Sequence, residues 1–130
     1  LFETITIPET GAQQGMWPDH CVQGTRGAQF HEQCQPVETD IIVSKGVDPL
    51  ANSHSAFGDA PEVTPLLADL QAKGVNKLFV VGLVYDYCVG ATALDGVKNG
   101  LRTYVVTDGT KSFAAETEEA MDKKLQEAGV

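Results

Sequence analysis

Continuous apolar runs and amphipathic segments alternate through the second half of the chain. The run LFVVGLV at 78–84 is apolar throughout and has polar neighbours, which predicts a central parallel strand buried on both faces. RTYVVT at 102–107 predicts the next strand, and IIVSK at 41–45 predicts a short buried strand that ends at Lys45. These three runs are the predicted sheet of this part of the chain.

Three other segments have apolar residues at helical spacing and predict helices. They cover residues 62–73, about 87–99 and about 115–128, and glycines at 74, 100 and 129 suit their C-terminal ends. The expected inner faces are Val63, Leu66, Leu67 and Leu70, then Val89, Ala93 and Val97, then Ala120, Met121, Leu125 and Ala128. Strands that alternate with helices at this rhythm predict an α/β fold, with a mainly parallel sheet and helices on its faces.

The first third of the chain has a different pattern. Residues 1–7 alternate apolar and polar side chains, which predicts a short strand. Residues 8–36 are rich in Gly, Pro, Gln and His and predict a long irregular stretch with room for a turn of helix, and residues 46–59 predict a second loop. Loops of this length in a compact domain are often functional.

Length and composition exclude several classes of protein. A chain of 130 residues predicts a single domain over 1–130, and the net charge of −9 argues against a nucleic-acid partner. No apolar run reaches the ~18–20 residues that cross a bilayer, so no membrane partner is expected. Three cysteines without a CxxC motif or regular spacing form no disulfide framework and favour a reducing compartment, the cytoplasm.

The most informative residue is Cys88, which lies where the apolar strand should end and a helix should begin. A helix N-terminus offers N–H groups and positive potential, which favour the reactive thiolate. Sites in an open α/β sheet form at the carboxyl ends of its strands, so Lys45 should share the edge of Cys88 and could stabilise that thiolate. A small core cysteine and a solvated loop lysine are the alternatives.

Other candidates are weaker when each is taken alone. Asp86 should cap the helix that follows it, because a carboxylate beside Cys88 would oppose the thiolate. His20 is a candidate metal ligand, although a lone loop histidine is more often only hydrogen-bonded. Trp17 could be a core residue or a flat wall for a planar ligand.

Three separate motifs together resemble one family. WPDHCVQGTRGAQFH, SKG and GLVYDYCVGATALDGVKNG stand in the order and near the spacing of the nicotinamidase branch of the isochorismatase-like cysteine hydrolases. The resemblance implies a three-layer α/β/α domain of Rossmann-like topology. It also implies an amidohydrolase of NAD salvage that converts nicotinamide and water into nicotinate and ammonia, with pyrazinamide as a second small-molecule substrate.

The resemblance also assigns roles to individual residues. It implies that Cys88 is the nucleophile, that Lys45 is the lysine of a catalytic triad, and that a cis peptide joins Leu83 to Val84. The backbone N–H groups of Val84 and Cys88 would form the oxyanion hole. The resemblance further implies that His20 is a ligand of a divalent metal ion, which would be zinc in preference to iron or manganese. It also implies that Trp17, Tyr87 and His54 bind the substrate.

The chain departs from the family pattern in two respects. His54 stands where the family usually has a tyrosine. The triad aspartate and two further metal ligands of the family belong to a segment before Leu1, and a strand is expected after Gly129. We therefore expect a domain incomplete at both ends and weak or absent activity of these 130 residues alone. Oligomeric state is open, and a homo-oligomer is compatible with the sequence.

Two alternatives to a nicotinamidase stay open on the sequence. One is a related cysteine amidohydrolase that acts on another carboxamide or on a carbamoyl compound. The other is a non-catalytic fragment that acts by binding. Isochorismate cleavage is disfavoured, because that branch of the family does not rely on this cysteine.

Overall fold

The computed structural model describes residues 3–11 and 13–130. Leu1 and Phe2, which belong to the predicted first strand, and Ala12 lie outside the described residues. The chain divides into two compact units, Leu1–Ile42 and Val43–Val130, and each is described by itself.

The first unit contains little regular structure. Strands β1 (Thr4–Thr6) and β2 (Gln13–Gly15) form a small antiparallel hairpin, in which Ile5 pairs with Gln14. The irregular stretch predicted over 8–36 contains one 3-10 turn, η1 (Arg26–Ala28), in agreement with the turn of helix that the sequence allowed there. The sequence therefore predicted the first strand and the irregular stretch, but not the second strand of the hairpin.

The second unit is an α/β structure built on a parallel pair of strands, as predicted. Strand β3 (Lys77–Leu83) pairs with β4 (Arg102–Lys111), starting with Lys77 opposite Arg102. The register shifts between Val80 and Gly82, so that Gly82 lies opposite Thr110. Strand β4 continues four residues past its predicted end, and the Thr110 hydroxyl donates to the Gly82 carbonyl at 2.6 Å.

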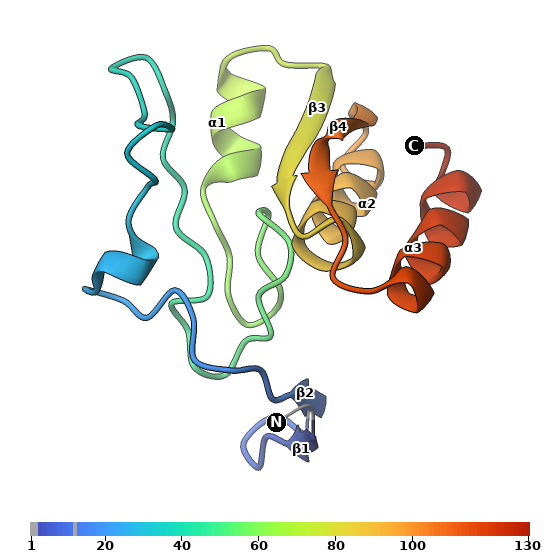
Figure 1. Ribbon diagram of the computed structural model, residues 1–130. Helices are drawn as coiled ribbons and strands as arrows, with labels where there is room; N and C mark the ends of the chain where they lie inside the picture. Colours follow the sequence, from blue (N-terminus) through green and yellow to red (C-terminus); the bar gives the residue numbers. More distant parts are fainter. Residues whose placement is uncertain (1–2, 12) are drawn as a thin grey trace. The chain divides into compact units, whose positions relative to one another are not determined.

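Helices cover one face of this pair (Figure 1). A π-helical turn, η2 (Tyr85–Val89), leads into α2 (Gly90–Lys98), which packs against both strands, while α3 (Ala115–Ala128) packs against α2 and η2. The third predicted helix is thus confirmed, and Gly129 ends it with a left-handed φ of 82°. The core between these elements consists of Val80, Tyr85, Val89, Ala93, Met121 and Leu125.

The other face of the pair corrects the prediction that the apolar strand is buried on both sides. Phe79, Val81 and Leu83 are 60%, 58% and 71% exposed. Among the described residues, no helix or strand of the second unit packs on this face. The ring of Phe79 stacks on Tyr104 at 5.1 Å, so two apolar rings remain at the surface. The run is apolar, as predicted. Burial of this face would require a further helix or strand packed on it, and the described residues include none in that position.

Two further predicted elements differ from the structure. Residues 41–45 form no strand, because β3 and β4 pair only with each other in the described part of the second unit and offer no ladder to this segment. The helix predicted over 62–73 is shorter, α1 (Leu66–Ala72), and has no buried residues. The side chains of Glu62 and Thr64 hydrogen-bond loop residues instead, and Val63 is exposed.

Helix α3 contributes two buried side chains, Met121 and Leu125, to the core. Leu125 is 4% exposed within the core, whereas its neighbour Lys124 is exposed. We expect Leu125→Ala to lower the free energy of unfolding by about 2–5 kcal/mol, since it removes buried carbons and leaves a cavity. Lys124→Ala should change it by less than about 0.5 kcal/mol. Urea unfolding followed by circular dichroism measures both, and equal effects would mean that α3 does not pack as described.

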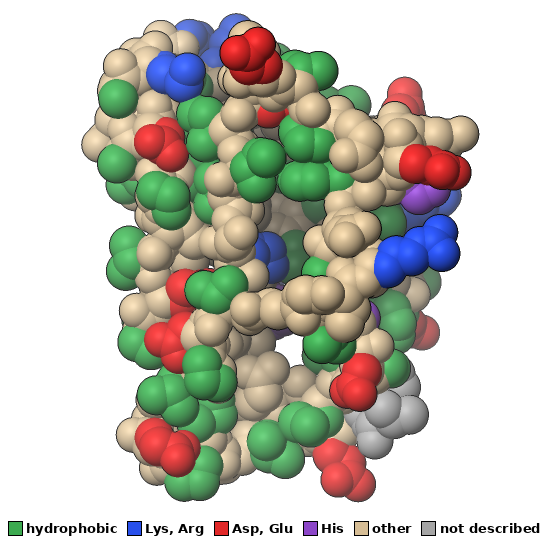
Figure 2. Space-filling model, turned by 90° about the vertical axis from the view of Figure 1, so that its left-hand side faces the viewer, with side chains coloured by type: hydrophobic (Ala, Val, Ile, Leu, Met, Phe, Trp, Pro, Cys, Tyr) green, Lys and Arg blue, Asp and Glu red, His purple; other side chains and the backbone are tan. Residues whose placement is uncertain are grey.

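The surface agrees with the acidic composition. On the face drawn in Figure 2, acidic and hydrophobic side chains are interspersed, and Lys and Arg occur in separate small groups. None of the helices in the described part of the chain has both the length and the apolar character needed to span a bilayer.

Candidate functional site

The centre of the site is the junction between β3 and α2. Strand β3 ends at Leu83, and the chain turns at once into η2, which carries Cys88 near its end. Single π-helical turns are rare and are frequent at functional sites. Cys88 is half-buried, and the Lys45 ammonium lies 3.5 Å from its sulfur. The two residues singled out from the sequence, 43 positions apart, are therefore in contact.

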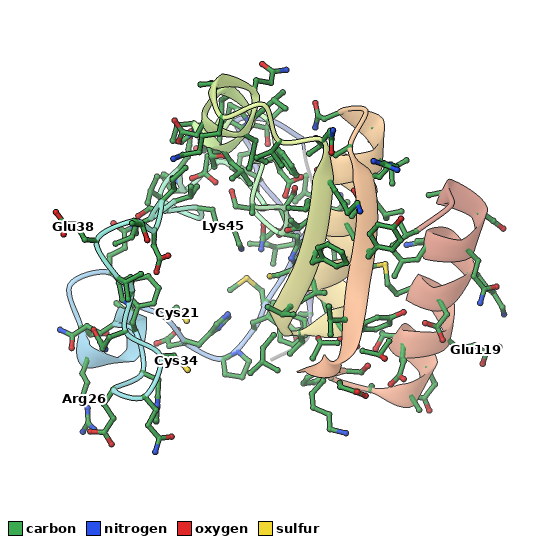
Figure 3. The ribbon with its side chains drawn as sticks, turned by 90° about the horizontal axis from the view of Figure 1, so that it is seen from above. Cys21, Arg26, Cys34, Glu38, Lys45 and Glu119 are labelled. Atoms are coloured by element: carbon green, nitrogen blue, oxygen red, sulfur yellow. The ribbon has the colours of Figure 1, made fainter. Side chains whose placement is uncertain are left out.

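The sequence predicted that Lys45 lies at the end of a strand. In the structure it reaches the thiol from a loop. Its ammonium also donates to the carbonyl of Ser53 at 2.7 Å, which fixes the end of the side chain. In Figure 3 the Lys45 side chain extends from its loop toward the β3–β4 sheet. An ammonium held in this way can stabilise negative charge that develops on the neighbouring sulfur.

The backbone before Cys88 has the feature that the resemblance implied. The peptide bond between Leu83 and Val84 is cis. The Val84 carbonyl accepts hydrogen bonds from the N–H groups of Tyr87 at 3.2 Å and Val89 at 3.1 Å. These bonds close the turn onto the end of the strand. The role of the Val84 and Cys88 N–H groups as an oxyanion hole stays a prediction.

Aromatic side chains lie beside the junction. The rings of His54 and Tyr87 are 5.6 Å apart, and Tyr87 meets Phe113 edge-on at 6.5 Å. Burial lowers the pKa of His54, and the Lys45 charge adds to this effect, while Asp59 opposes it. His54 is therefore a neutral ring near neutral pH, able both to donate and to accept a hydrogen bond.

Trp17 and His20 belong to the first unit. Trp17 is half-buried, whereas His20 is exposed and its Nδ1 lies 2.7 Å from the carbonyl oxygen of Pro18. Donation from Nδ1 would leave Nε2 available as a ligand atom. Over residues 3–11 and 13–130, however, no three His, Cys, Asp or Glu side chains come together as a metal site.

Asp86 caps a different helix from the one predicted. Its carboxylate accepts the N–H groups of Phe113 at 2.9 Å and Ala114 at 3.2 Å and the hydroxyl of Thr117, at the start of α3. Burial alone would raise the pKa of Asp86, but the bonds from Thr117 and the main chain outweigh it and leave that pKa below its ordinary value. The predicted cap of the following helix was therefore wrong, because the start of α3, far along the chain, supplies the donors to this carboxylate.

Sequence reasoning missed a second buried carboxylate, Glu62. Its oxygens accept the N–H groups of Gly46 at 2.9 Å, Val47 at 2.8 Å and Asp48 at 3.2 Å, together with the Ser53 hydroxyl. The Ser53 bond, helped by the three N–H groups and opposed by burial, lowers the pKa of Glu62 from 4.5 to about 2. The only signal in the sequence was an acidic residue directly after Pro61, which fitted a helix start equally well.

The lowered pKa of Glu62 makes stability depend on pH. A carboxyl with a depressed pKa stabilises the folded state above pH 4.5 and loses this contribution as the pH falls toward 2. We expect the stability advantage of the chain over its Glu62→Gln variant to shrink between these two pH values. Urea unfolding of both proteins from pH 2 to 7 measures it, and an advantage that stays constant would contradict the hydrogen-bonded carboxylate.

Comparison with known proteins relates this geometry to a family. The Isochorismatase domain profile matches residues 6–130. A nicotinamidase of Acinetobacter baylyi is 37% identical over 114 residues, which are 86% of this chain and 52% of that protein. A nicotinamidase/pyrazinamidase of Mycobacterium tuberculosis is 39% identical over 88% of this chain and 61% of its own length. The chain thus spans between about half and three fifths of these relatives.

Solved structures give the same result. A nicotinamidase and pyrazinamidase of Acinetobacter baumanii has a TM-score of 0.89 and 36% identity, covering 99% of this chain and 63% of its own. A protein from L. infantum in complex with nicotinate has a TM-score of 0.83 and 38% identity, over 89% and 59%. A pyrazinamidase of Pyrococcus horikoshii in complex with zinc has a TM-score of 0.78 and 35% identity, over 95% and 64%.

Proposed function

The chain belongs to the isochorismatase family, and from this premise we propose that its domain is a nicotinamidase-type cysteine amidohydrolase. The proposed reaction converts nicotinamide and water into nicotinate and ammonia. The observation that carries the proposal is the Lys45 ammonium held 3.5 Å from the Cys88 sulfur at the end of β3. Relatives named nicotinamidase support the choice of amide, and the L. infantum structure contains the corresponding acid.

The proposed chemistry begins with the thiolate. Lys45 stabilises the negative sulfur of Cys88 after a general base has taken the thiol proton, a role that the family resemblance gives to an aspartate. The sulfur attacks the amide carbonyl carbon, and the oxygen becomes negative within reach of the Val84 and Cys88 N–H groups. Collapse breaks the C–N bond, ammonia leaves with the proton, and a thioester to Cys88 remains. Water hydrolyses the thioester, which releases the acid and restores the thiol.

The aromatic cluster supports a flat substrate ring. Tyr87 and His54 lie beside the junction that carries Cys88, and a neutral His54 can hydrogen-bond a heteroaromatic ring or its amide. We propose these two residues, with Trp17 of the first unit, as the residues that bind nicotinamide or pyrazinamide. Where the family has tyrosine, His54 offers a different polar group to the substrate.

A divalent metal ion would orient the substrate and supply Lewis-acid chemistry where it is bound. The P. horikoshii pyrazinamidase is described in complex with zinc. His20, with Nδ1 bonded to a carbonyl, is the ligand that we propose from this chain. The described residues do not complete a set of three ligands around it, so no step above depends on the metal.

We further propose a cytoplasmic protein that acts in NAD salvage on small carboxamides. The three cysteines are all free thiols, which suits a reducing compartment. A homo-oligomer stays compatible with the surface described above.

An assay of ammonia release tests the proposed reaction. Nicotinamide should give ammonia and nicotinate in equal amounts, and simple aliphatic amides should give far less, because they do not fill an aromatic site. Faster turnover of another carboxamide would keep the cysteine hydrolase and replace its substrate. Binding of nicotinamide without release of ammonia from any amide, even by the whole protein that contains this domain, would contradict the enzyme and favour a binding function.

A further inference from the structure

The strongest feature outside the proposed catalytic set is the buried carboxylate of Glu62. It is 7% exposed and lies in the loop before α1. The partners described above are three successive main-chain N–H groups and one hydroxyl, all donors to a negative group. Several charge-assisted bonds on one carboxylate fix the conformation of the segment that supplies the donors.

Two of these donors, Gly46 and Ser53, are directly connected to Lys45. Gly46, whose N–H group bonds to Glu62 at 2.9 Å, directly follows Lys45 in the chain. Ser53, whose hydroxyl donates to Glu62, also offers its carbonyl to the Lys45 ammonium at 2.7 Å. One carboxylate therefore holds both the backbone from which the lysine starts and the residue at which its side chain ends.

The same loop is tied to the helix that follows the nucleophile. The N–H group of Ala56 donates to the Thr92 hydroxyl oxygen at 2.9 Å, and Thr64 donates to the Ala56 carbonyl at 2.6 Å. Thr92 lies in α2, four residues beyond Cys88. The loop thus has one anchor beside Lys45 and another beside Cys88, and the lysine-to-sulfur distance depends on both.

We propose that Glu62 is a positioning residue, whose carboxylate folds residues 46–53 so that the Lys45 ammonium is held against the Cys88 sulfur. The proposal rests on the proposed roles of Lys45 and Cys88. The hydrogen bonds of the Glu62 carboxylate go to residues 46–48 and 53, so it acts on the sulfur through Lys45.

The reactivity of Cys88 tests the proposal without any need for turnover. Iodoacetamide labelling of the 130-residue chain, resolved by peptide mass spectrometry, gives separate rates for Cys88, Cys21 and Cys34. The last two are exposed, lie in the first unit and are labelled in Figure 3. We expect Glu62→Gln to slow labelling of Cys88 at pH 7 by about five- to tenfold, because the lysine is released, and to leave the other two rates unchanged.

The direction of the effect distinguishes positioning from simple electrostatics. Removing a negative charge near a thiol would by itself favour the thiolate and speed labelling. A slower reaction therefore requires that the lysine has moved. In a Lys45→Ala background, Glu62→Gln should cause no further slowing, since the lysine through which it acts is already gone.

Matched variants keep the test informative if Glu62→Gln folds poorly. Ser53→Ala removes the hydroxyl donor but keeps the carbonyl that binds Lys45, and should slow Cys88 by about two- to threefold, whereas Ser53→Thr should restore the rate. Glu119→Gln makes the same change of charge at an exposed carboxylate that pairs with Lys123 on α3, and serves as a control without effect on Cys88 labelling.

Two results would overturn the proposal. One is an unchanged or faster Cys88 rate in folded Glu62→Gln or Ser53→Ala. The other is the same slowing in the Lys45→Ala background. Failure to hydrolyse nicotinamide would count against the proposed function and leave these labelling results standing, so the two claims can fail separately.

Discussion

Ammonia release from nicotinamide should be abolished by Cys88→Ala. The substitution removes the sulfur that would form the proposed thioester, and loss of a nucleophile costs roughly 10⁴-fold or more in turnover. Cys88 is half-buried and near the core residue Val89, so removal of one sulfur atom should leave the fold intact. The measurement is the initial rate of ammonia release by folded protein that carries this domain, with circular dichroism to confirm the fold.

The matched control is Cys34→Ser. Cys34 is an exposed thiol of the first unit. Its substitution should leave the rate within about twofold, as expected for a surface position away from the site. Turnover that survives in Cys88→Ala would exclude the thioester route, whatever the substrate.

The second largest effect is expected for Lys45→Ala, which should lower turnover by about 10²–10³-fold. Opposite unit charges ~4 Å apart attract by about 4 kcal/mol at an effective dielectric constant of ~20. The ammonium 3.5 Å from the Cys88 sulfur is in this range, and the attraction is weakened by the partial exposure of the site. The rate constant kcat should fall far more than the affinity for substrate, because the lysine acts on the sulfur.

Two other substitutions give this prediction its controls. Lys98→Ala removes an exposed lysine that pairs with Asp95 on α2 and should leave turnover unchanged. Lys45→Arg should restore little, since a planar guanidinium cannot occupy the position of a compact ammonium between Ser53 and the sulfur. Equal losses in Lys45→Ala and Lys98→Ala would show a general effect of charge and contradict the assigned contact.

The parts of the fold that could be predicted from the sequence are those with strong local periodicity. The apolar run of β3, the helix over Ala115–Ala128 and the glycine that ends it are set by neighbouring residues, so their type and position follow from spacing. The strand-to-helix position of Cys88 follows in the same way. Its contact with Lys45 was expected from the rule that sites collect at one edge of a parallel sheet, but the strand that this rule required at 41–45 is absent, and a loop brings the lysine to the sulfur.

The parts that were wrong depend on distant partners. A strand over 41–45 requires a neighbouring ladder, and burial of both faces of β3 requires a second layer, and neither requirement can be read from the residues themselves. The carboxylate of Asp86 accepts the N–H group of Phe113, and that of Glu62 accepts the N–H group of Gly46. Both hydrogen bonds form because the chain between the partners folds back. A carboxylate in a loop carries no local sign of the N–H groups that it will bind.

Relative labelling of the three thiols in the unmodified chain tests most directly whether Cys88 is an activated nucleophile. Cys21 and Cys34 are exposed, whereas Cys88 is half-buried. If exposure alone controlled the reaction, Cys88 would be labelled last. We predict that iodoacetamide at pH 7 labels Cys88 first, because the Lys45 ammonium 3.5 Å away stabilises negative charge on the attacking sulfur. Labelling of Cys88 after both exposed cysteines would contradict it.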